Sequence, residues 1–296
     1  MIEKSRENTI FNSVITVFMC LFLLTMIYPL WYCFICALSE PVEVYTGNII
    51  LLPKGFTLEN FAAVFRTESL VSGFLNTILY AVVGTVIGIS ATFTAAYPLS
   101  RKDLAGRGIL MKIYLLPMFI SGGLVPTFIL VRDLGLYNTI WALVLPGAVG
   151  AWNIIVVRTY MISSIPGELQ EAAMIDGAGT FRLFFHIILP MCKPILAVMI
   201  MFHVVGYWNQ YFNALIYLSD ESKYPIQLVL RKILIQNNIE DLISSGGVST
   251  GMLEQTIRAE AIKYAAIIVT SVPMLIIYPC FQKFFEKGMV VGSLKG

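Results

Sequence analysis

Charged side chains are scarce in this chain, and acidic ones are absent from its long apolar stretches. Only 13% of the 296 residues are charged, whereas 57% are hydrophobic and the mean hydropathy is +0.79. Soluble domains carry about 25% charged and about 45–50% apolar residues. The composition therefore excludes an ordinary soluble domain and predicts an integral membrane protein. The formal net charge of +2 gives no reason to expect a nucleic-acid partner.

Groups that would supply energy or chemistry are also missing from these stretches. No Asp or Glu lies inside them, where titratable groups are costly and usually functional. His203 is the only histidine inside them, and we interpret it as a packed, hydrogen-bonded residue rather than a ligand. The chain has no Gly-Lys dipeptide, so the P-loop pattern that binds ATP phosphates is absent. These absences disfavour two classes of membrane protein, an ion-coupled secondary carrier and a membrane-embedded enzyme.

The five cysteines give no sign of a metal or redox site. Cys33 and Cys36 are one helical turn apart, but no histidine or carboxylate cluster accompanies them. We interpret them as small lipid-phase residues and predict no metal site.

Six apolar stretches are long enough to cross a bilayer. A spanning helix needs about 20 mostly apolar residues, because its backbone must be hydrogen-bonded internally in lipid. The stretches are too continuously apolar for barrel strands, and the first is too long for a signal peptide. The sequence predicts an all-α membrane protein with a single transmembrane domain, residues 1–296. The predicted spans are residues 11–38, 71–99, 109–131, 138–161, 194–218 and 262–285, with a polar loop at 163–190 and a long outer loop at 219–260.

The positive charges favour one orientation. Twelve of the 20 Lys and Arg residues fall at the two termini, in the second loop and in the polar loop with its flanks. The other eight are spread over longer loops on the opposite side. Because Lys and Arg accumulate in cytoplasmic loops, we expect both termini and the polar loop to face the cytoplasm.

The polar loop has the pattern of two short helices joined by a glycine. Glu171 lies near the start of the first helix, where an acidic group is favourable. Ala172 and Ala173 give a small apolar face that would let another surface approach closely, and Gly177 can adopt the left-handed conformation that ends a helix. An amphipathic helix lying on the lipid surface is the alternative, but the loop lacks the basic face and bulky apolar stripe typical of one.

The same loop fills every fixed position of a known signature. The matching residues are Glu171-Ala172-Ala173, Asp176-Gly177-Ala178, Phe184, Ile187, Leu189 and Pro190. On these residues the chain resembles the bacterial binding-protein-dependent ABC import permeases. Its C-terminal tail is similar to that of MalG-type sugar permeases. Residues 121–127 and 224–231 are similar to the LplC/YtcP-type subgroup, and the likeness extends to Asn76-Thr77, Ala95–Tyr97, Ser100-Arg101 and residues 134–139.

This resemblance implies a fold, partners and a substrate class. It implies a MetI-like permease in a bacterial cell membrane, paired with a second permease, two ABC ATPase subunits and an extracellular or periplasmic solute-binding protein. ATP and Mg would bind the ATPase, so this chain would carry no cofactor and catalyse no reaction. The implied substrate is a carbohydrate, either an oligosaccharide or a related glycan. The signature residues 171–190 would form an elbow of two short helices that contacts the ATPase. By position in the signature, Glu171 would anchor this contact, and Ala172 and Ala173 would fit a groove of the ATPase. Asp176 would brace the elbow, Gly177 would permit its bend, and Pro190 would end its second helix.

Two groups of residues are candidates for the solute pathway. The fifth span contains a run that mixes aromatic faces with amide groups, which suits sugars. A membrane-interface aromatic belt is the equal alternative for this run. In the fourth span the candidates are Trp152 and Asn153, for which packing is the favoured interpretation. The candidates in the fifth span are Tyr207, Trp208, Asn209, Tyr211 and Asn213.

The outer segments contain further helix patterns. Apolar residues from Ile226 to Leu234 recur at helical spacing and predict an amphipathic helix. This helix would contact the solute-binding protein or pack at the outer interface. The Ser- and Gly-rich residues 244–251 predict a turn, and a short helix is expected after Thr57.

Overall fold

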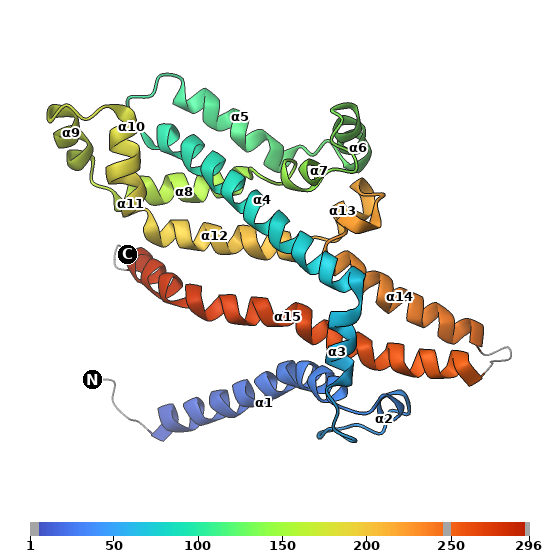
Figure 1. Ribbon diagram of the computed structural model, residues 1–296. Coiled ribbons are helices and arrows are strands. Elements are labelled where there is room, and N and C mark those ends of the chain that lie inside the picture. The colour runs from blue at the N-terminus through green and yellow to red at the C-terminus, as the bar shows by residue number, and fades with distance from the viewer. Residues whose placement is uncertain (1–5, 245–249, 294–296) are drawn as a thin grey trace. The chain divides into compact units, whose positions relative to one another are not determined.

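The computed structural model describes residues 6–244 and 250–293, and in these ranges it contains helices, turns and loops but no strand (Figure 1). The all-α prediction is confirmed. The helices are α1 (Arg6–Ala37), α2 (Pro41–Tyr45), α3 (Glu59–Arg66), α4 (Glu68–Ser100), α5 (Arg107–Phe119), α6 (Leu124–Asp133), α7 (Ile140–Val144), α8 (Ala151–Ser164), α9 (Gly167–Ile175), α10 (Thr180–Leu183), the π-helix η1 (Phe184–Ile188), α11 (Leu189–Met191), α12 (Lys193–Trp208), α13 (Phe212–Tyr217), the 3-10 helix η2 (Glu221–Lys223), α14 (Ile226–Ser244) and α15 (Thr250–Ser293).

Three described helices are long and apolar enough to cross a membrane without interruption. They run over Asn8–Ala37, Glu68–Ser100 and Glu254–Gln282. Two further pairs pass the same test only when taken together. Arg107–Phe119 and Leu124–Asp133 are bent by 115°, and Thr180–Met191 and Lys193–Trp208 are bent by 80°. The fourth predicted span is divided into α7 and α8. The structure therefore shows three to five candidate spans where the sequence predicted six continuous ones.

The breaks occur at residues that cannot continue a helix. Gly123, between α5 and α6, has φ +83°, which is favourable only for glycine. Pro146 follows α7, and proline has no backbone N–H to donate. At the end of α12, the side chain of Asn209 donates to the carbonyl of Val205 at 3.0 Å and competes with the helical ladder. A hydropathy pattern averages over such single residues, and this is why it predicted continuous spans.

The chain forms two compact units, each described here by itself. The first unit comprises residues 1–71 and 230–272, and the second comprises residues 72–229 and 273–296. In the first unit, the end of α1 and the segment after it pack on α15. The buried residues there are Ile35, Cys36, Val44, Ile49 and Ala261.

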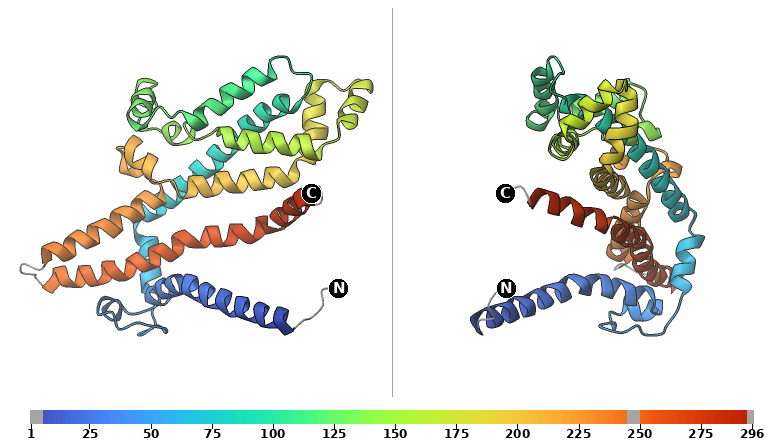
Figure 2. Two further views of the ribbon diagram at one scale, coloured as in Figure 1. Left: turned by 180° about the vertical axis from the view of Figure 1, so that it is seen from behind. Right: turned by 90° about the vertical axis from the view of Figure 1, so that its left-hand side faces the viewer.

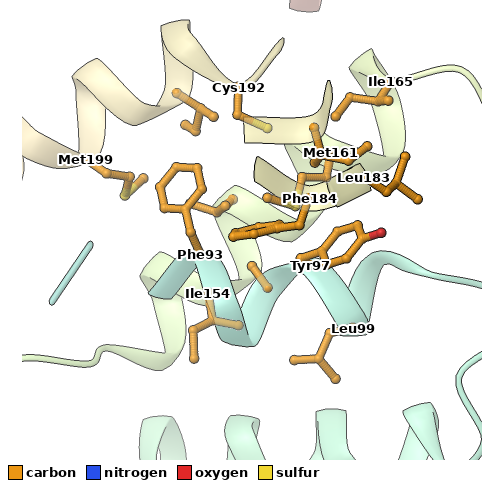
Figure 3. Packing of buried hydrophobic residues seen from close by; sticks show 14 of the residues in the cluster. Phe93, Tyr97, Leu99, Ile154, Met161, Ile165, Leu183, Phe184, Cys192 and Met199 are labelled. Atoms are coloured by element: carbon orange, nitrogen blue, oxygen red, sulfur yellow. The ribbon is translucent and has the colours of Figure 1, made fainter. Parts of the chain in front are cut away.

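The second unit has a core at the end where α4 and α8 terminate. Phe93 and Tyr97 from α4 pack there against Ile154 and Met161 from α8 and against Phe184 (Figure 3). The two views of Figure 2 place α9 and α10 at this same end of the unit. The polar loop predicted at 163–190 therefore packs directly on the ends of α4 and α8.

The opposite end of the second unit is held by polar side chains of α4. Asn76 donates to the carbonyls of Ser222 and Tyr224, at 2.7 and 3.2 Å. The hydroxyl of Thr77 accepts from the backbone N–H of Ile226 at 2.8 Å. These contacts give a structural reason for the Asn76-Thr77 pair found in the sequence, because they fix the turn that leads into α14.

Several smaller predictions have definite outcomes. The short helix after Thr57 is confirmed as α3, and the amphipathic helix from Ile226 is confirmed as α14. The turn at 244–251 falls largely on residues 245–249, outside the described residues. Lys4 and Lys295, which contribute to the predicted orientation, also lie outside them.

Candidate coupling surface and solute cavity

The first helix of the polar loop ends in a Schellman motif. After α9, Gly177 has φ +79° and donates its N–H to the carbonyl of Met174 at 3.0 Å, while Ala178 donates to Ala173 at 2.9 Å. These two bonds satisfy carbonyls that a helix end leaves unpaired. The predicted glycine break is therefore present, and it turns the chain from α9 into α10.

The exposed face of this elbow is more apolar than the sequence suggested. Ile175 and Phe181, on either side of the glycine turn, are 86% and 82% exposed. Glu171 and Ala172 are also exposed, and the carboxylate of Glu171 has no hydrogen bond or ion pair among the described residues. Exposed large apolar side chains of this kind mark a surface that binds another protein or a membrane. The residue-by-residue signature had not singled out Ile175 or Phe181, although both stand out as bulky apolar residues within a polar loop.

Three predicted elbow residues occupy other places than expected. Ala173 is only 8% exposed and belongs to the core, so it does not lie on the outer face with Ala172. The side chain of Asp176 is exposed and forms no bracing contact in the described part of the chain. Pro190 lies inside α11, and the bend into α12 occurs two residues later, at Cys192. Each difference arises from the backbone path around Gly177 and η1, which the sequence pattern does not specify.

The elbow is fixed to the end of α4 by aromatic packing. The rings of Tyr97 and Phe184 have centroids 5.1 Å apart, and both residues are buried (Figure 3). Ala173 and Leu183 lie in the same core cluster. A push on the exposed face would therefore reach α4 through close-packed side chains, which transmit strain well.

A polar cluster surrounds the loop that follows α4. Arg101 binds both carboxylate oxygens of Asp103, at 2.8 and 2.6 Å, and also approaches the Tyr97 hydroxyl at 3.3 Å and the Met174 sulfur at 3.7 Å. The hydrogen bonds from Arg101 lower the pKa of the Asp103 carboxyl, and the hydrogen bond to Asp103 raises the pKa of the Arg101 guanidinium. Because Met174 belongs to α9, this cluster is a second link between α4 and the elbow.

A cavity of about 470 Å³ opens in the second unit, away from the elbow. It lies where α7, α8, α12 and α13 meet. Five of the seven predicted pathway residues line it, together with His203 and Gln210, which the prediction did not include. The complete lining is Leu143, Gly147, Asn153, Phe202, His203, Gly206, Tyr207, Asn209, Gln210, Tyr211, Phe212 and Asn213.

Some of the cavity's polar groups are already bonded within the protein. The Tyr207 hydroxyl donates to the carbonyl of Val144 at 2.9 Å, and the Gln210 amide donates to Leu143 at 3.2 Å. These bonds satisfy carbonyls exposed by the break after α7. By contrast, the side chain of Asn213 has no hydrogen bond within the described chain. Its amide can therefore both donate to and accept from a solute.

The wall formed by α12 depends on two glycines of α4. A Cβ atom at Gly84 would come within 2.3 Å of the Tyr207 ring, and one at Gly88 would come within 2.5 Å of the His203 ring. Only glycine leaves room for these rings. His203 is buried, with its Nε2 3.4 Å from the Asn153 amide nitrogen. The packed, hydrogen-bonded interpretation of His203 fits this placement.

Two predicted pathway residues do not line the cavity. Trp208 is buried on another side of α12 and packs edge-on against Phe74, with the two ring centroids 5.5 Å apart. Trp152 is 49% exposed and packs on Phe202 at 6.0 Å. The helical period explains both, since a residue adjacent in sequence to a lining residue points about 100° away from it.

No group of three or more metal-ligating side chains occurs among the described residues.

Comparison with known proteins gives one consistent family. Residues 84–291 match the family model described as the binding-protein-dependent transport system inner membrane component. The chain is 37% identical to the polygalacturonan/rhamnogalacturonan transport system permease protein YtcP of Bacillus subtilis, over 98% of this chain and 100% of the relative. It is also 37% identical to Protein LplC of the same organism, over 91% of this chain and 90% of the relative.

A solved structure extends the likeness to three dimensions. A chain from the crystal structure of a bacterial ABC transporter involved in the import of the acidic polysaccharide alginate superposes with a TM-score of 0.86. The two chains are 29% identical, and the match covers 96% of this chain and 100% of the other. The resemblance inferred from the signature loop is thereby confirmed. This chain belongs to the family of binding-protein-dependent transport system inner membrane components, and it is a membrane permease rather than an enzyme.

Proposed function

We propose that this chain is one permease subunit of an ATP-driven importer of oligosaccharides or related glycans. The observation that carries the proposal is the elbow itself. It displays Ile175, Phe181 and an unpaired Glu171, and it is packed onto α4 through Phe184. The exposed apolar side chains suit the binding of a partner protein. The buried packing on α4 would pass a push from that partner to the helix.

The partner at the elbow would be the ABC ATPase, which binds ATP and Mg, because the described chain offers no P-loop. Two ATPase copies, a second permease and an external solute-binding protein would complete the complex. Drawing the ATPases together would press on the elbow and convert an inward-facing cavity into an outward-facing one. Six membrane crossings follow if α5 with α6, α7 with α8, and α12 with α13 each form one broken span. Both termini and the elbow would then face the cytoplasm, as the positive charges predict.

The solute would pass along the cavity lined by Asn153, Tyr207, Asn209, Tyr211 and Asn213. No Asp, Glu, Lys or Arg is among its lining residues. The lining combines amide groups with flat rings, and sugars offer hydroxyls and apolar ring faces to match them. YtcP is named for polygalacturonan and rhamnogalacturonan transport, and this supports a glycan as the substrate class.

Uptake by the reconstituted complex tests the proposal. The complex would be purified with its ATPase, placed in liposomes and supplied with binding protein and labelled oligogalacturonides. We expect uptake that requires ATP and is lost in Glu171→Gln, while the variant chain still inserts in the membrane. Uptake driven by an ion gradient without ATP would contradict the proposal and support the carrier alternative.

A further inference from the structure

The turn between α13 and α14 is bound by two parts of the second unit that lie far apart in the sequence. The hydroxyl of Tyr80 in α4 donates to the carbonyl of Lys223 at 2.7 Å. Nζ of Lys223 in turn donates to the carbonyl of Asn138 at 3.0 Å. Asn138 belongs to residues 134–139, one of the stretches on which the chain resembles its family. This stretch forms no part of the elbow or of the cavity lining.

The backbone of Asn138 is in the left-handed conformation. Its φ is +58°, and among the described residues no other residue apart from glycine has a positive φ. Asparagine tolerates this conformation better than most residues, but at a cost that surrounding contacts must offset. One such contact is the bond from its N–H to the carbonyl of Tyr217, at 2.8 Å. Tyr217 is the last residue of α13, so the left-handed turn directs a donor at the end of that helix.

The side chain of Asn138 binds the same end of α13. Its Oδ1 accepts from the backbone N–H of Ser219 at 3.2 Å and from that of Asp220 at 3.1 Å. These two N–H groups come directly after the C-cap residue Leu218, and neither has another acceptor in the described part of the chain. The C-terminal end of α13 is therefore fixed through both the backbone and the side chain of one residue.

The start of α13 is tied to the same region. Gln210 lies two residues before α13, and its Nε2 donates to the carbonyl of Leu143 in α7 at 3.2 Å. Asn138 lies two residues before α7. Between these ties, Ala214 and Tyr217 are buried in the core cluster that also contains Leu143. Helix α7 and the residues just before it therefore hold α13 at both ends.

Helix α13 carries Phe212 and Asn213, which line the solute cavity. We propose that Asn138 is a positioning residue for the solute pathway, which seats α13 on α7 so that the amide of Asn213 faces the cavity. The proposal rests on the proposed passage of the solute along this cavity. Asparagine meets both requirements at this position, since it adopts the left-handed φ and its short side chain carries the acceptor. A wall that is fixed before the solute arrives lowers the ordering cost of binding.

Saturation curves of uptake in proteoliposomes that hold the full complex test this role. Asn138→Gly keeps the left-handed φ and removes the Oδ1 acceptor. We expect a several-fold higher KM, because the solute meets a displaced wall, and an unchanged Vmax per assembled complex, because the elbow is intact. KM does not depend on how much complex assembles, so a lower yield of the variant does not affect the comparison. A KM equal to that of the parent would overturn the proposal.

The conservative variant separates positioning from general packing at this residue. Asn138→Asp keeps an acceptor oxygen and tolerates the same φ, so we expect its KM to match that of the parent. A rise in KM as large as in the glycine variant would overturn the proposal. Asn60→Ala is the matched control, because it removes two side-chain hydrogen bonds, to the carbonyls of Ala37 and Ser39, in the first unit. We expect an unchanged KM there, and an equal rise would show general destabilisation and overturn the role of Asn138.

Asn213→Ala, measured alongside, distinguishes this proposal from the proposed pathway. We expect the combined Asn138→Gly and Asn213→Ala variant to raise KM by less than the product of the two separate rises, because both changes act on one wall. A rise in Asn213→Ala alone would overturn the positioning role and leave the pathway standing. If neither variant raises KM while uptake still requires ATP, the assigned pathway is wrong and the positioning role falls with it, whereas the importer remains.

Discussion

The rings of Tyr97 and Phe184 meet 5.1 Å apart at an interplanar angle of 38°, and they join the end of α4 to the π-helix of the elbow. This contact connects the surface proposed to receive the ATPase with a helix whose Gly84 and Gly88 pack against two side chains of the cavity lining, Tyr207 and His203. We propose that the ATPase pushes on the elbow and that the movement is passed on to α4.

Weakening this contact should uncouple ATP hydrolysis from uptake. In Phe184→Leu the core keeps an apolar side chain but loses the aromatic pair, which is worth about 0.5–1.5 kcal/mol beyond its buried area. We expect fewer solute molecules imported per ATP hydrolysed in proteoliposomes. Phe119→Leu is the control, because Phe119 is 83% exposed and outside the core. An unchanged ratio in Phe184→Leu would count against this route.

Replacing Gly177 by alanine should strain the elbow. A side chain at φ +79° costs roughly 1–3 kcal/mol, although a Cβ there would meet no neighbouring atom within 4 Å. We expect lower uptake with normal membrane insertion. Gly167→Ala is the matched control, since Gly167 has an ordinary helical φ and equally open space. Similar loss in both variants would show that the left-handed conformation is not the cause.

Truncating the exposed apolar face should release the ATPase. In Phe181→Ala no buried contact of this chain is lost, because the side chain is 82% exposed. Central aromatic residues of an interface contribute about 2 kcal/mol or more, which corresponds to roughly 30-fold in affinity. We expect much less ATPase to co-purify. Phe119→Ala removes an equally exposed ring (83%) at the end of α5, and it should leave the ATPase bound.

Substitutions at two residues of the α12–α13 region should separate a role in lining the cavity from a role in packing. Asn213→Ala removes an unbonded amide from the cavity, so we expect a raised KM for uptake with little loss of stability. Trp208→Phe changes a residue outside the cavity and should leave KM unchanged. Saturation curves of uptake measure both. A KM change in the tryptophan variant alone would place the solute pathway elsewhere.

The stability of the turn between α13 and α14 should depend on the charge of Asp220. Hydrogen bonds from Ser222 and the nearby Lys223 lower the pKa of the Asp220 carboxyl. Its contribution to stability is therefore present above the ordinary carboxyl pKa of about 3.9 and is lost as pH falls through the lowered folded-state value. Asp220→Asn should melt at a lower temperature than the parent at pH 7, and the difference should shrink at pH 3. A constant difference would contradict the assignment.

The glycine turn within the polar loop could be predicted because its information is local. Gly177 needs only its own φ to end α9, and the signature residues are close together in the chain. The breaks in the spans were missed because Gly123, Pro146 and Asn209 each change the path within an otherwise apolar stretch. The roles of Gly84 and Gly88 were also invisible, since they depend on rings more than a hundred positions away. Burial of Ala173 could not be predicted for the same reason, because it belongs to a core cluster with residues of helices distant in the sequence.

Purification of the complex from its native membrane is the most direct test of whether an ABC ATPase binds this chain at the elbow. The chain would be extracted gently, and the proteins that accompany it would be identified by mass spectrometry. We expect a second permease together with an ABC ATPase, and loss of the ATPase alone in Phe181→Ala. A homo-oligomer without an ATPase, or an ATPase retained unchanged in that variant, would contradict it.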